Sequence, residues 1–504
     1  MGQPRGWASY SAGPGLAPAS YSAESTFVPA ANGGTRDELR PELADLGRLA
    51  RRGMRAVVGA ARAEGRPRLS SILAQHLGPG TGGYDVVEET WPAYDHVNVQ
   101  AGVDAWLAEP GRSSEIVGVV SQHGQPVDLA QLLNQEGPSD PYGPRPGNAA
   151  SINVACGPDG QVRPCLRCGI YLITEEGRRS AVLVRSPMPE YGHNGVSVQV
   201  VSTDEDGGRR AAADIRAAAL EHNVFRGQVL SFGQEVFGHG QTLLRFHRRP
   251  TMGADQLILA AETLAEVQRQ VVEVARHKSR LLSAGQHLKR GLLLYGPPGT
   301  GKTHTVRYLT SSLVGTTVIQ LTGNAMHLIA EACSVARTLQ PAMVVIEDVD
   351  LIAEDRGMHP GRHPLLFQLL NEMDGLAEDA DVVFVLTTNR ADLLEPALAA
   401  RPGRIDQAVS LDLPASDARR RLFDLYRGRL AVDTSGLDDV ILRTEGVTAS
   451  FLKELLRRAA LLAATRDGGA DELSVSAGDL SSALDELLDT RNAMTRTLLG
   501  STPS

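Results

Sequence analysis

Residues 291–305, GLLLYGPPGTGKTHT, constrain the fold more than any other part of this 504-residue chain. A short apolar run leads into the pattern Gly-x4-Gly-Lys-Thr, and a segment compatible with a helix follows. Glycines let backbone amides turn toward a phosphate chain, and the first turn of the following helix presents N–H groups without helical partners. The pattern therefore predicts a strand, a phosphate-binding loop and a helix.

The polar side chains of this loop are of the kind that bind a nucleoside triphosphate. Lys302 would place its positive charge near the β- and γ-phosphates, and the Thr303 hydroxyl is suited to Mg²⁺. The whole chain has only four lysines, so a lysine at this position is informative. The predicted ATP-binding residues are Gly296, Pro297, Pro298, Gly299, Thr300, Gly301, Lys302, Thr303 and His304.

A second apolar run, residues 343–346, leads directly into the acids Glu347 and Asp348. Side chains alternate along a strand, so these two carboxylates should point to opposite sides. Open α/β sheets bind their ligands at the carboxyl ends of the strands. We therefore expect the two acids to have different roles in one site.

Five stretches, in this order, resemble the AAA ATPase family: GPPGTGKT, VVIEDVD, LLFQLLNEMDGL, VFVLTTNRADLLEPAL and ARPGRID. The resemblance covers roughly residues 255 to 490. It implies an α/β fold, a P-loop NTPase parallel sheet with a small helical lid, here preceded by an α+β N-terminal domain. It also implies ATP and Mg²⁺ as cofactors, ATP hydrolysis, and a homo-oligomeric ring, most often a hexamer.

The acidic pair departs from the usual family order, which is Asp-Glu. By position, Glu347 takes the magnesium role with Thr303, partly through water, and Asp348 takes the role of the acid that polarises the attacking water. Asp348 is one methylene shorter than the usual glutamate, so the water must lie closer to the strand. The mitochondrial Rieske-protein translocase branch shares the Glu-Asp order, so we expect slow but real turnover.

The same resemblance assigns three further catalytic residues. Asn389 matches the family's first sensor, an amide that helps to position the water. Arg401 and Arg404 match the arginine fingers, which reach the nucleotide of the neighbouring subunit in the family; a planar guanidinium suits the charge that develops during phosphoryl transfer. In the lid, Thr448 and Ala449 replace the usual Ser-Gly.

The segment that faces the central pore in threading members of the family is unusual in this chain. Residues 323–336 are several positions short and contain no aromatic residue. Met326, His327 and Leu328 are the candidates to hold a polypeptide. The short segment disfavours threading and again resembles the Rieske-protein translocase branch, while other motifs resemble FtsH-like and proteasomal ATPases.

Composition predicts the remaining organisation. The predicted parts are a disordered tail (1–34), a helical segment (35–82), an N-terminal α+β domain for a substrate or partner (83–250), a large P-loop ATPase subdomain (251–411), a small helical lid (412–494) and a tail (495–504). Two interpretations remain open for the cysteines at positions 156, 165 and 168. They are either buried thiols or ligands of a zinc ion, and their spacing favours buried thiols.

Charge and motifs exclude several classes of protein. A net charge of −9 and a pI near 5.8 make nucleic acid an unlikely partner. We find no leader sequence and no apolar run of transmembrane length, so we expect a cytoplasmic protein. The sequence lacks H-E-x-x-H, which argues against a protease of the FtsH kind.

Two hypotheses for the function remain. The first is an ATP-hydrolysing AAA ring that remodels or disassembles a protein complex, with the client bound by the N-terminal domain. The alternative is a nucleotide-dependent assembly scaffold or switch with little hydrolysis.

Overall fold

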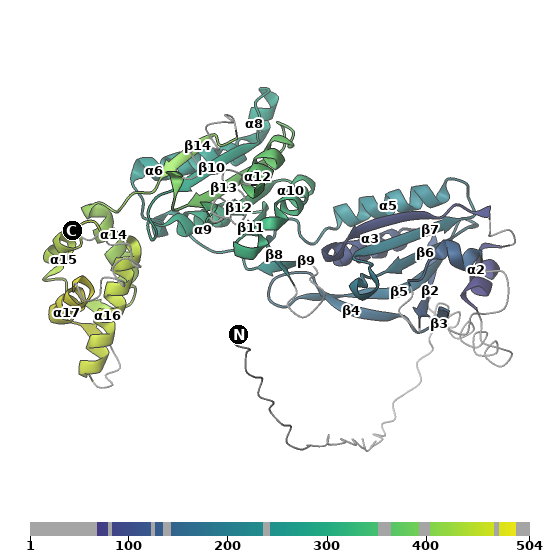
Figure 1. The fold of residues 1–504 in the computed structure, drawn as a ribbon, viewed down its shortest axis with the longest axis horizontal. Coiled ribbons are helices and arrows are strands. Elements are labelled where there is room, and N and C mark those ends of the chain that lie inside the picture. The colour runs from purple at the N-terminus through teal and green to yellow at the C-terminus, as the bar shows by residue number, and fades with distance from the viewer. Residues whose placement is uncertain are drawn as a thin grey trace, which may run out of the picture. The chain divides into compact units, whose positions relative to one another are not determined.

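The computed structural model describes residues 68–78, 83–121, 126–134, 143–234, 242–350, 364–392, 404–467 and 473–489. The predicted tails (1–34 and 495–504) and most of the predicted helical segment lie outside the described residues. Three groups of elements follow one another along the rest of the chain: an antiparallel sheet, a largely parallel sheet and a set of helices (Figure 1).

The antiparallel sheet has the strand order β1-β7-β6-β5-β2-β3, with β4 paired to β5. Its strands are β1 (Val87–Pro92), β2 (Arg112–Val120), β3 (Arg145–Gly147), β4 (Ala150–Ala155), β5 (Val162–Glu175), β6 (Arg178–Arg185) and β7 (Gly195–Ser202). Apolar residues on both sides of β6 and β7 fill two separate cores. The sheet is therefore covered on both faces.

Helices form these two covers. The helices α3 (His96–Leu107) and α5 (Gly207–Glu221) pack on one face, and α2 (Leu69–Leu77) and α4 (Leu129–Leu133) pack on the other. Alternation explains the arrangement: Val182 and Val184 of β6 face α3 and α5, whereas Ala181 and Leu183 face α2 and α4. Two short 3₁₀ turns, η2 (Ala93–Asp95) and η3 (Pro189–Tyr191), complete this part.

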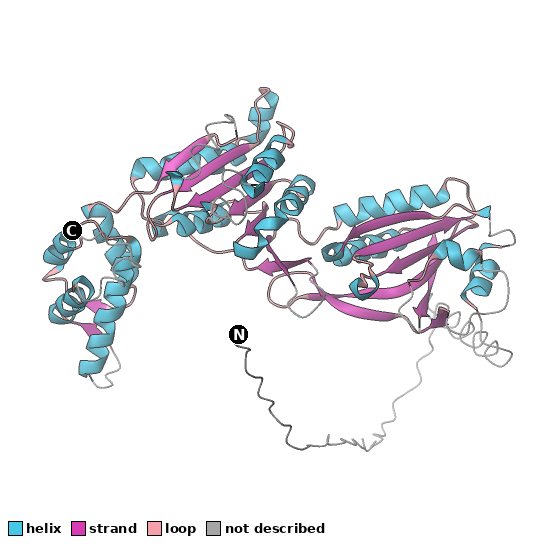
Figure 2. Cartoon of the chain, viewed as in Figure 1, coloured by secondary structure: helices cyan, strands magenta, loops and turns pink. Residues whose placement is uncertain are grey.

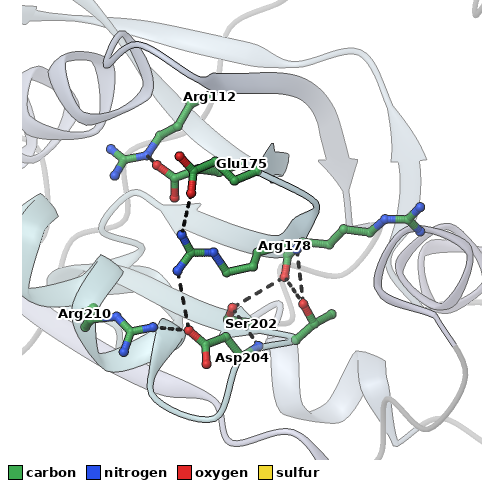
Figure 3. A network of polar contacts seen from close by, with 9 residues as sticks. Arg112, Glu175, Arg178, Ser202, Asp204 and Arg210 are labelled. Atoms are coloured by element: carbon green, nitrogen blue, oxygen red, sulfur yellow. Dashed lines mark hydrogen bonds and ion pairs between the residues drawn. The ribbon is translucent and has the colours of Figure 1, made fainter.

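A network of ion pairs ties one end of this sheet together (Figure 3). Arg112 of β2 donates from Nε to Glu175 of β5 at 2.9 Å. Arg178 of β6 lies 3.9 Å from Asp204, which Arg210 of α5 also contacts. Each of these cations lies beside a carboxylate, so the network joins strands β2, β5 and β6 with the helix α5.

The second sheet has the order β14-β10-β13-β12-β11-β8-β9 and is parallel except for β9. Its strands are β8 (Val229–Gln234), β9 (Thr242–His247), β10 (Arg290–Tyr295), β11 (Thr317–Leu321), β12 (Ala342–Ile346), β13 (Val382–Thr388) and β14 (Gln407–Ser410). Every residue of β12 and β13 is buried, as in a parallel sheet covered on both faces. The predicted α/β class is confirmed.

Two strands of this sheet come from the region that we predicted as the N-terminal domain. β8 runs parallel to β11, with Val229 opposite Val318, and β9 folds back against β8. The parallel sheet thus reaches back to residue 229. Local apolar alternation predicts that such strands exist, but not which sheet they join.

Helices and shorter turns cover the parallel sheet. They are η4 (Ala254–Gln256), α6 (Ala261–Val267), the π-helical η5 (Gln268–Glu273), α7 (Val274–Arg276), α8 (Lys278–Ser283), α9 (Lys302–Ser312), η6 (Gly323–Leu328), α10 (Ile329–Thr338) and α12 (Pro364–Asp374). One core lies between the sheet, α10 and α12, and another lies between the sheet, α6, η5 and α9.

The C-terminal part is mainly helical (Figure 2). It comprises α14 (Ser416–Arg427), α15 (Leu437–Arg443), α16 (Ala449–Asp467) and α17 (Ala477–Leu488), with the short strand pair β15 (Ala431–Val432) and β16 (Ser474–Val475). Phe423 of α14 and Phe451 of α16 are fully buried in its core. The predicted helical lid is therefore present.

Of the helices in the described part of the chain, none combines the length and the apolar character needed to cross a membrane.

Candidate nucleotide site

The predicted site residues follow three neighbouring strands of the parallel sheet. The glycine-rich loop follows β10, the acids follow β12, and Asn389 follows β13. β13 pairs with both of the other strands, and Tyr295 at the end of β10 lies opposite Thr388 at the end of β13. Because all three strands are parallel, their carboxyl ends meet at one edge, where such sheets bind ligands.

Glycine is required within the loop between β10 and α9. Gly299 has a φ of +83° and Gly301 a φ of +110°, which side-chain-bearing residues rarely adopt. A Cβ on Gly299 would lie 2.9 Å from the Thr448 hydroxyl and 3.0 Å from the Ser450 hydroxyl. Thr448, the first of the two residues that replace the family's Ser-Gly, and Ser450 therefore lie against the phosphate-binding loop, a contact that the sequence alone did not reveal.

Lys302 begins α9 and is buried at 8% exposure. Its Nζ donates to the carbonyls of Gly296 at 2.7 Å and Pro297 at 2.9 Å. Burial lowers the pKa of this ammonium, while the negative charges of Asp348 and Asp350 oppose that shift. The amine is thus held against the loop that is predicted to bind the phosphates.

Glu347 and Thr303 form the expected oxygen pair. The Thr303 hydroxyl donates to Glu347 Oε2 at 3.3 Å. Burial raises the pKa of Glu347; the hydrogen bond from Thr303 lowers it, and the nearby Asp348 raises it. A hydroxyl and a carboxylate are the hard oxygen ligands that Mg²⁺ prefers, so this chemistry fits the metal.

Asp348 lies in the left-handed region, with a φ of +52°. Its backbone N–H donates to Thr387 Oγ1 at 3.1 Å, and its carboxylate accepts from Asn389 Nδ2 at 3.3 Å. The two acids therefore have different partners, Thr303 for Glu347 and Asn389 for Asp348. We derived that difference from strand alternation, whereas in the structure the chain has left the strand and turns at Asp348.

Asp350 is a site residue that the sequence reasoning missed. It is 7% exposed, and its Oδ1 accepts from Thr388 Oγ1 at 2.8 Å and from the Asn389 backbone N–H at 3.3 Å. The available signal was its place as the last acid of the stretch EDVD, two positions after Asp348. Its partners follow it by almost forty positions, so spacing alone could not identify them.

His304 lies in the first turn of α9, after Thr303. Burial lowers the pKa of its imidazole, and the positive charges of Arg307 and Lys453 lower it further. A lowered pKa favours a neutral ring at physiological pH. The predicted contact of His304 with ATP stays a prediction.

Of the two predicted arginine fingers, the structure describes only Arg404. Arg401 lies outside the described residues. Arg404 has a side chain that is 9% exposed and forms an ion pair with Asp374 at the end of α12. In this subunit Arg404 is engaged within its own chain, so contact with a neighbouring nucleotide would require this pair to open.

The segment predicted to face a pore forms η6, and most of its apolar side chains are buried. Met326 is 5% exposed and Leu328 is 6% exposed, and both belong to the core that contains Phe232 of β8. His327 between them is exposed. Two of the three residues proposed to hold a polypeptide thus pack inside the subunit.

The cysteines of the C-x-x-C stretch pack in different cores. Cys165 lies in the core that contains Leu230, whereas Cys168 packs against the core that contains Leu183. Burial raises the pKa of the Cys165 thiol to about 12 and that of Cys168 to about 11. Within the described residues no group of three or more His, Cys, Asp or Glu side chains could hold a metal ion. The two thiols therefore do not converge on one site.

Comparison with known proteins agrees with this geometry. Residues 292–413 match the model of the ATPase family associated with various cellular activities (AAA). The chain is 36% identical over 243 residues to ATP-dependent zinc metalloprotease FtsH 2 of Sphaerobacter thermophilus, which covers 46% of this chain and 36% of that protein. It is 32% identical over 247 residues to ATP-dependent zinc metalloprotease FtsH of Thermus thermophilus, with coverage of 46% and 38%.

A chloroplast relative matches over a longer stretch. ATP-dependent zinc metalloprotease FTSH 1, chloroplastic, of Oryza sativa subsp. japonica is 27% identical over 350 residues, which is 63% of this chain and 50% of that protein. The chain thus spans half or less of the length of these three relatives. The matched region contains the phosphate-binding loop, the acidic pair and Asn389, which the fold brings together. By this match, residues 292–413 of the chain form an AAA domain, the ATPase domain of the family associated with various cellular activities.

Proposed function

We propose that this chain binds ATP with Mg²⁺ and hydrolyses the terminal phosphate. The observation that supports this most directly is the convergence of Lys302, the Thr303–Glu347 pair and the Asp348–Asn389 pair at the ends of three adjacent strands. Phosphoryl transfer depends mainly on positioning and on stabilising charge, and these groups can supply both.

Each residue has a distinct part in this mechanism. Lys302 leaves its loop carbonyls to bind the phosphates, and α9 presents backbone N–H groups to the same anion. Thr303 and Glu347 would hold a magnesium ion, which when bound would neutralise charge on the phosphates. Asp348 accepts the proton of the attacking water, and Asn389, whose amide lies beside that carboxylate, orients the water.

The wider role that we propose is remodelling or disassembly of a protein complex by a homo-oligomeric ring, a hexamer, with the client bound by the part before residue 250. Three relatives whose names describe ATP-dependent proteases support an ATP-driven action on proteins. The 504 residues contain no H-E-x-x-H, so we do not extend the protease chemistry to them. The burial of Met326 and Leu328 favours remodelling without threading.

Two observations favour the alternative of a nucleotide-dependent scaffold or switch. Asp348 reaches less far than the glutamate usual in the family, and Arg404 is paired with Asp374 in its own chain. Both features would slow hydrolysis. In that case ATP binding orders the assembly and turnover is minor.

Steady-state ATPase measurements with Asp348→Asn separate these functions. For remodelling, the wild type releases phosphate at least about 100-fold faster than Asp348→Asn, while both bind a fluorescent ATP analogue equally well. Asp379→Asn, the same change at an exposed position before β13, is the matched control and should behave as the wild type. Tight ATP binding with equal, negligible turnover in all three proteins would support the switch.

A further inference from the structure

We infer that Asp350 is a positioning residue of this site, which fixes the end of β13 against the acidic turn and so sets Asp348 and Asn389 for hydrolysis. This inference rests on the proposed ATPase function, because it concerns how that site is built. Asp350 acts through its contacts with Thr388 and Asn389, and we assign it no contact with the nucleotide or the attacking water.

The contacts of Asp350 join two segments that are distant in the sequence. Its Oδ1 accepts from the Thr388 hydroxyl at 2.8 Å and from the Asn389 backbone N–H at 3.3 Å. The Thr388 hydroxyl also accepts from the Arg390 N–H at 2.9 Å. Thr388 is fully buried and Asp350 is 7% exposed, so water competes little for these bonds. One carboxylate oxygen thereby anchors the backbone that carries Asn389.

The turn that carries Glu347 and Asp348 forms two further hydrogen bonds with β13. The Val349 N–H donates to the Thr387 carbonyl at 2.9 Å, and the Asp348 N–H donates to the Thr387 hydroxyl at 3.1 Å. One residue earlier, the Glu347 N–H points to Leu321 of β11 at 3.3 Å. The backbone hydrogen bonds of the chain therefore switch from β11 to β13 at Asp348, where φ is +52°.

The short side chain of Asp348 makes this attachment important. A glutamate could reach the water through several rotamers. An aspartate has only one methylene, so the position of its carboxylate depends more strongly on the position of its backbone. That backbone is in a conformation that non-glycine residues rarely hold unless their surroundings enforce it. Asp350, two positions later, supplies a buried and charged acceptor that keeps the turn and β13 in one arrangement.

The test compares Asp350→Ala, Asp350→Asn and Thr388→Val with the full-length wild type. We expect Asp350→Ala to lower kcat at least about tenfold, since a displacement of about 1 Å at a reacting centre can cost about 100-fold. Its affinity for a fluorescent ATP analogue with Mg²⁺ should change less than about threefold, because Lys302 and Thr303 are untouched. Asp350→Asn keeps a carbonyl acceptor and should recover most of the rate.

Thr388→Val and a matched control distinguish positioning from general stability. Thr388→Val should slow turnover, and the double variant with Asp350→Ala should be no slower than Asp350→Ala alone, because both remove one connection. Asp381→Ala is the control: this acid precedes the other end of β13 and lies 3.5 Å from Lys278 and 3.6 Å from Arg290. It should lower the melting temperature without lowering kcat.

Amide hydrogen exchange provides a readout that is independent of turnover. Peptides covering residues 385–392 should exchange faster in Asp350→Ala and at the wild-type rate in Asp381→Ala. Wild-type hydrolysis with unchanged kcat in Asp350→Ala, or equal loss of kcat in Asp381→Ala, overturns this inference alone. Absence of hydrolysis in the wild type overturns the proposed function and this inference with it.

Discussion

The carboxylate of Asp348 accepts a hydrogen bond from the side-chain amide of Asn389 at 3.3 Å, although 41 positions separate them in the sequence. The two residues follow β12 and β13, which are neighbours in the sheet. The contact joins the acid proposed to activate water and the amide proposed to orient it. A water between this pair and the terminal phosphate would be bound on two sides.

Asn389→Ala should therefore lower kcat by about 10- to 100-fold, because the water loses one of the groups that orient it. ATP affinity should stay within about threefold of the wild type. The measurement is phosphate release under saturating ATP together with nucleotide titration. A variant with unchanged kcat and weakened ATP binding would instead mean that Asn389 helps to bind ATP and does not stabilise the transition state.

The burial of η6 leads to a prediction about stability. Met326→Ala and Leu328→Ala should each lower the free energy of unfolding by about 2–5 kcal/mol, as expected for large apolar side chains removed from a core. His327→Ala, at the exposed position between them, should change it by less than about 0.5 kcal/mol. Urea unfolding of the three variants checks this. Equal, small effects for all three would mean that the segment lies outside the core.

Asp95 in η2 should make stability depend on pH. Burial raises the pKa of this carboxyl from 3.8 to about 6, and the hydrogen bond from Asn98 opposes the shift. The folded state thus disfavours the ionised form, and this group's stabilising contribution is present below pH 4 and lost as pH rises through 6.

Asp95→Asn removes the ionisation and keeps an oxygen acceptor for Asn98. It should stabilise the protein by up to about 3 kcal/mol above pH 7 and by nothing measurable below pH 4. Chemical denaturation at pH 4 and pH 8 tests this, with Asp379→Asn as an exposed control. A gain that is the same at both pH values would rule out ionisation of Asp95 as its cause.

The thiols of Cys165 and Cys168 should resist alkylation in the folded protein. Their pKa values, raised to about 12 and about 11 by burial, leave very little thiolate at pH 8. Iodoacetamide should label them at least about 100-fold more slowly than after unfolding, as followed by mass spectrometry. Cys156, which is partly exposed, is an internal comparison. Zinc released in proportion to labelling would contradict the assignment as buried thiols.

Local sequence patterns were enough to predict which strand ends come together, while the roles of the residues there stay predictions. The glycine-rich loop, the apolar runs of β10, β12 and β13 and the residues that follow them are contiguous in the sequence. A parallel sheet then brings the strand ends together by necessity. Lys302, Glu347 and Asn389 were therefore predictable from motif and strand topology together.

Other features depend on partners that are distant in the sequence. Asp348 adopts a left-handed turn because Thr387 of a later strand binds its N–H. Arg404 is held by Asp374, which lies 30 positions earlier. Apolar periodicity suggested neither contact, since it reports which face of an element is buried and not which side chains meet there.

The pairing of β8 with β11 decides where this protein can be cut. A fragment that starts at residue 251 would lack β8 and β9, leaving one side of β11 with unpaired backbone groups beside a buried apolar surface. Such a fragment would tend to aggregate even with its catalytic residues intact. A fragment that starts before Val224 would retain both strands, so the edge of the ATPase sheet is protected by β8 and β9, which precede the first motif of the nucleotide site in the sequence.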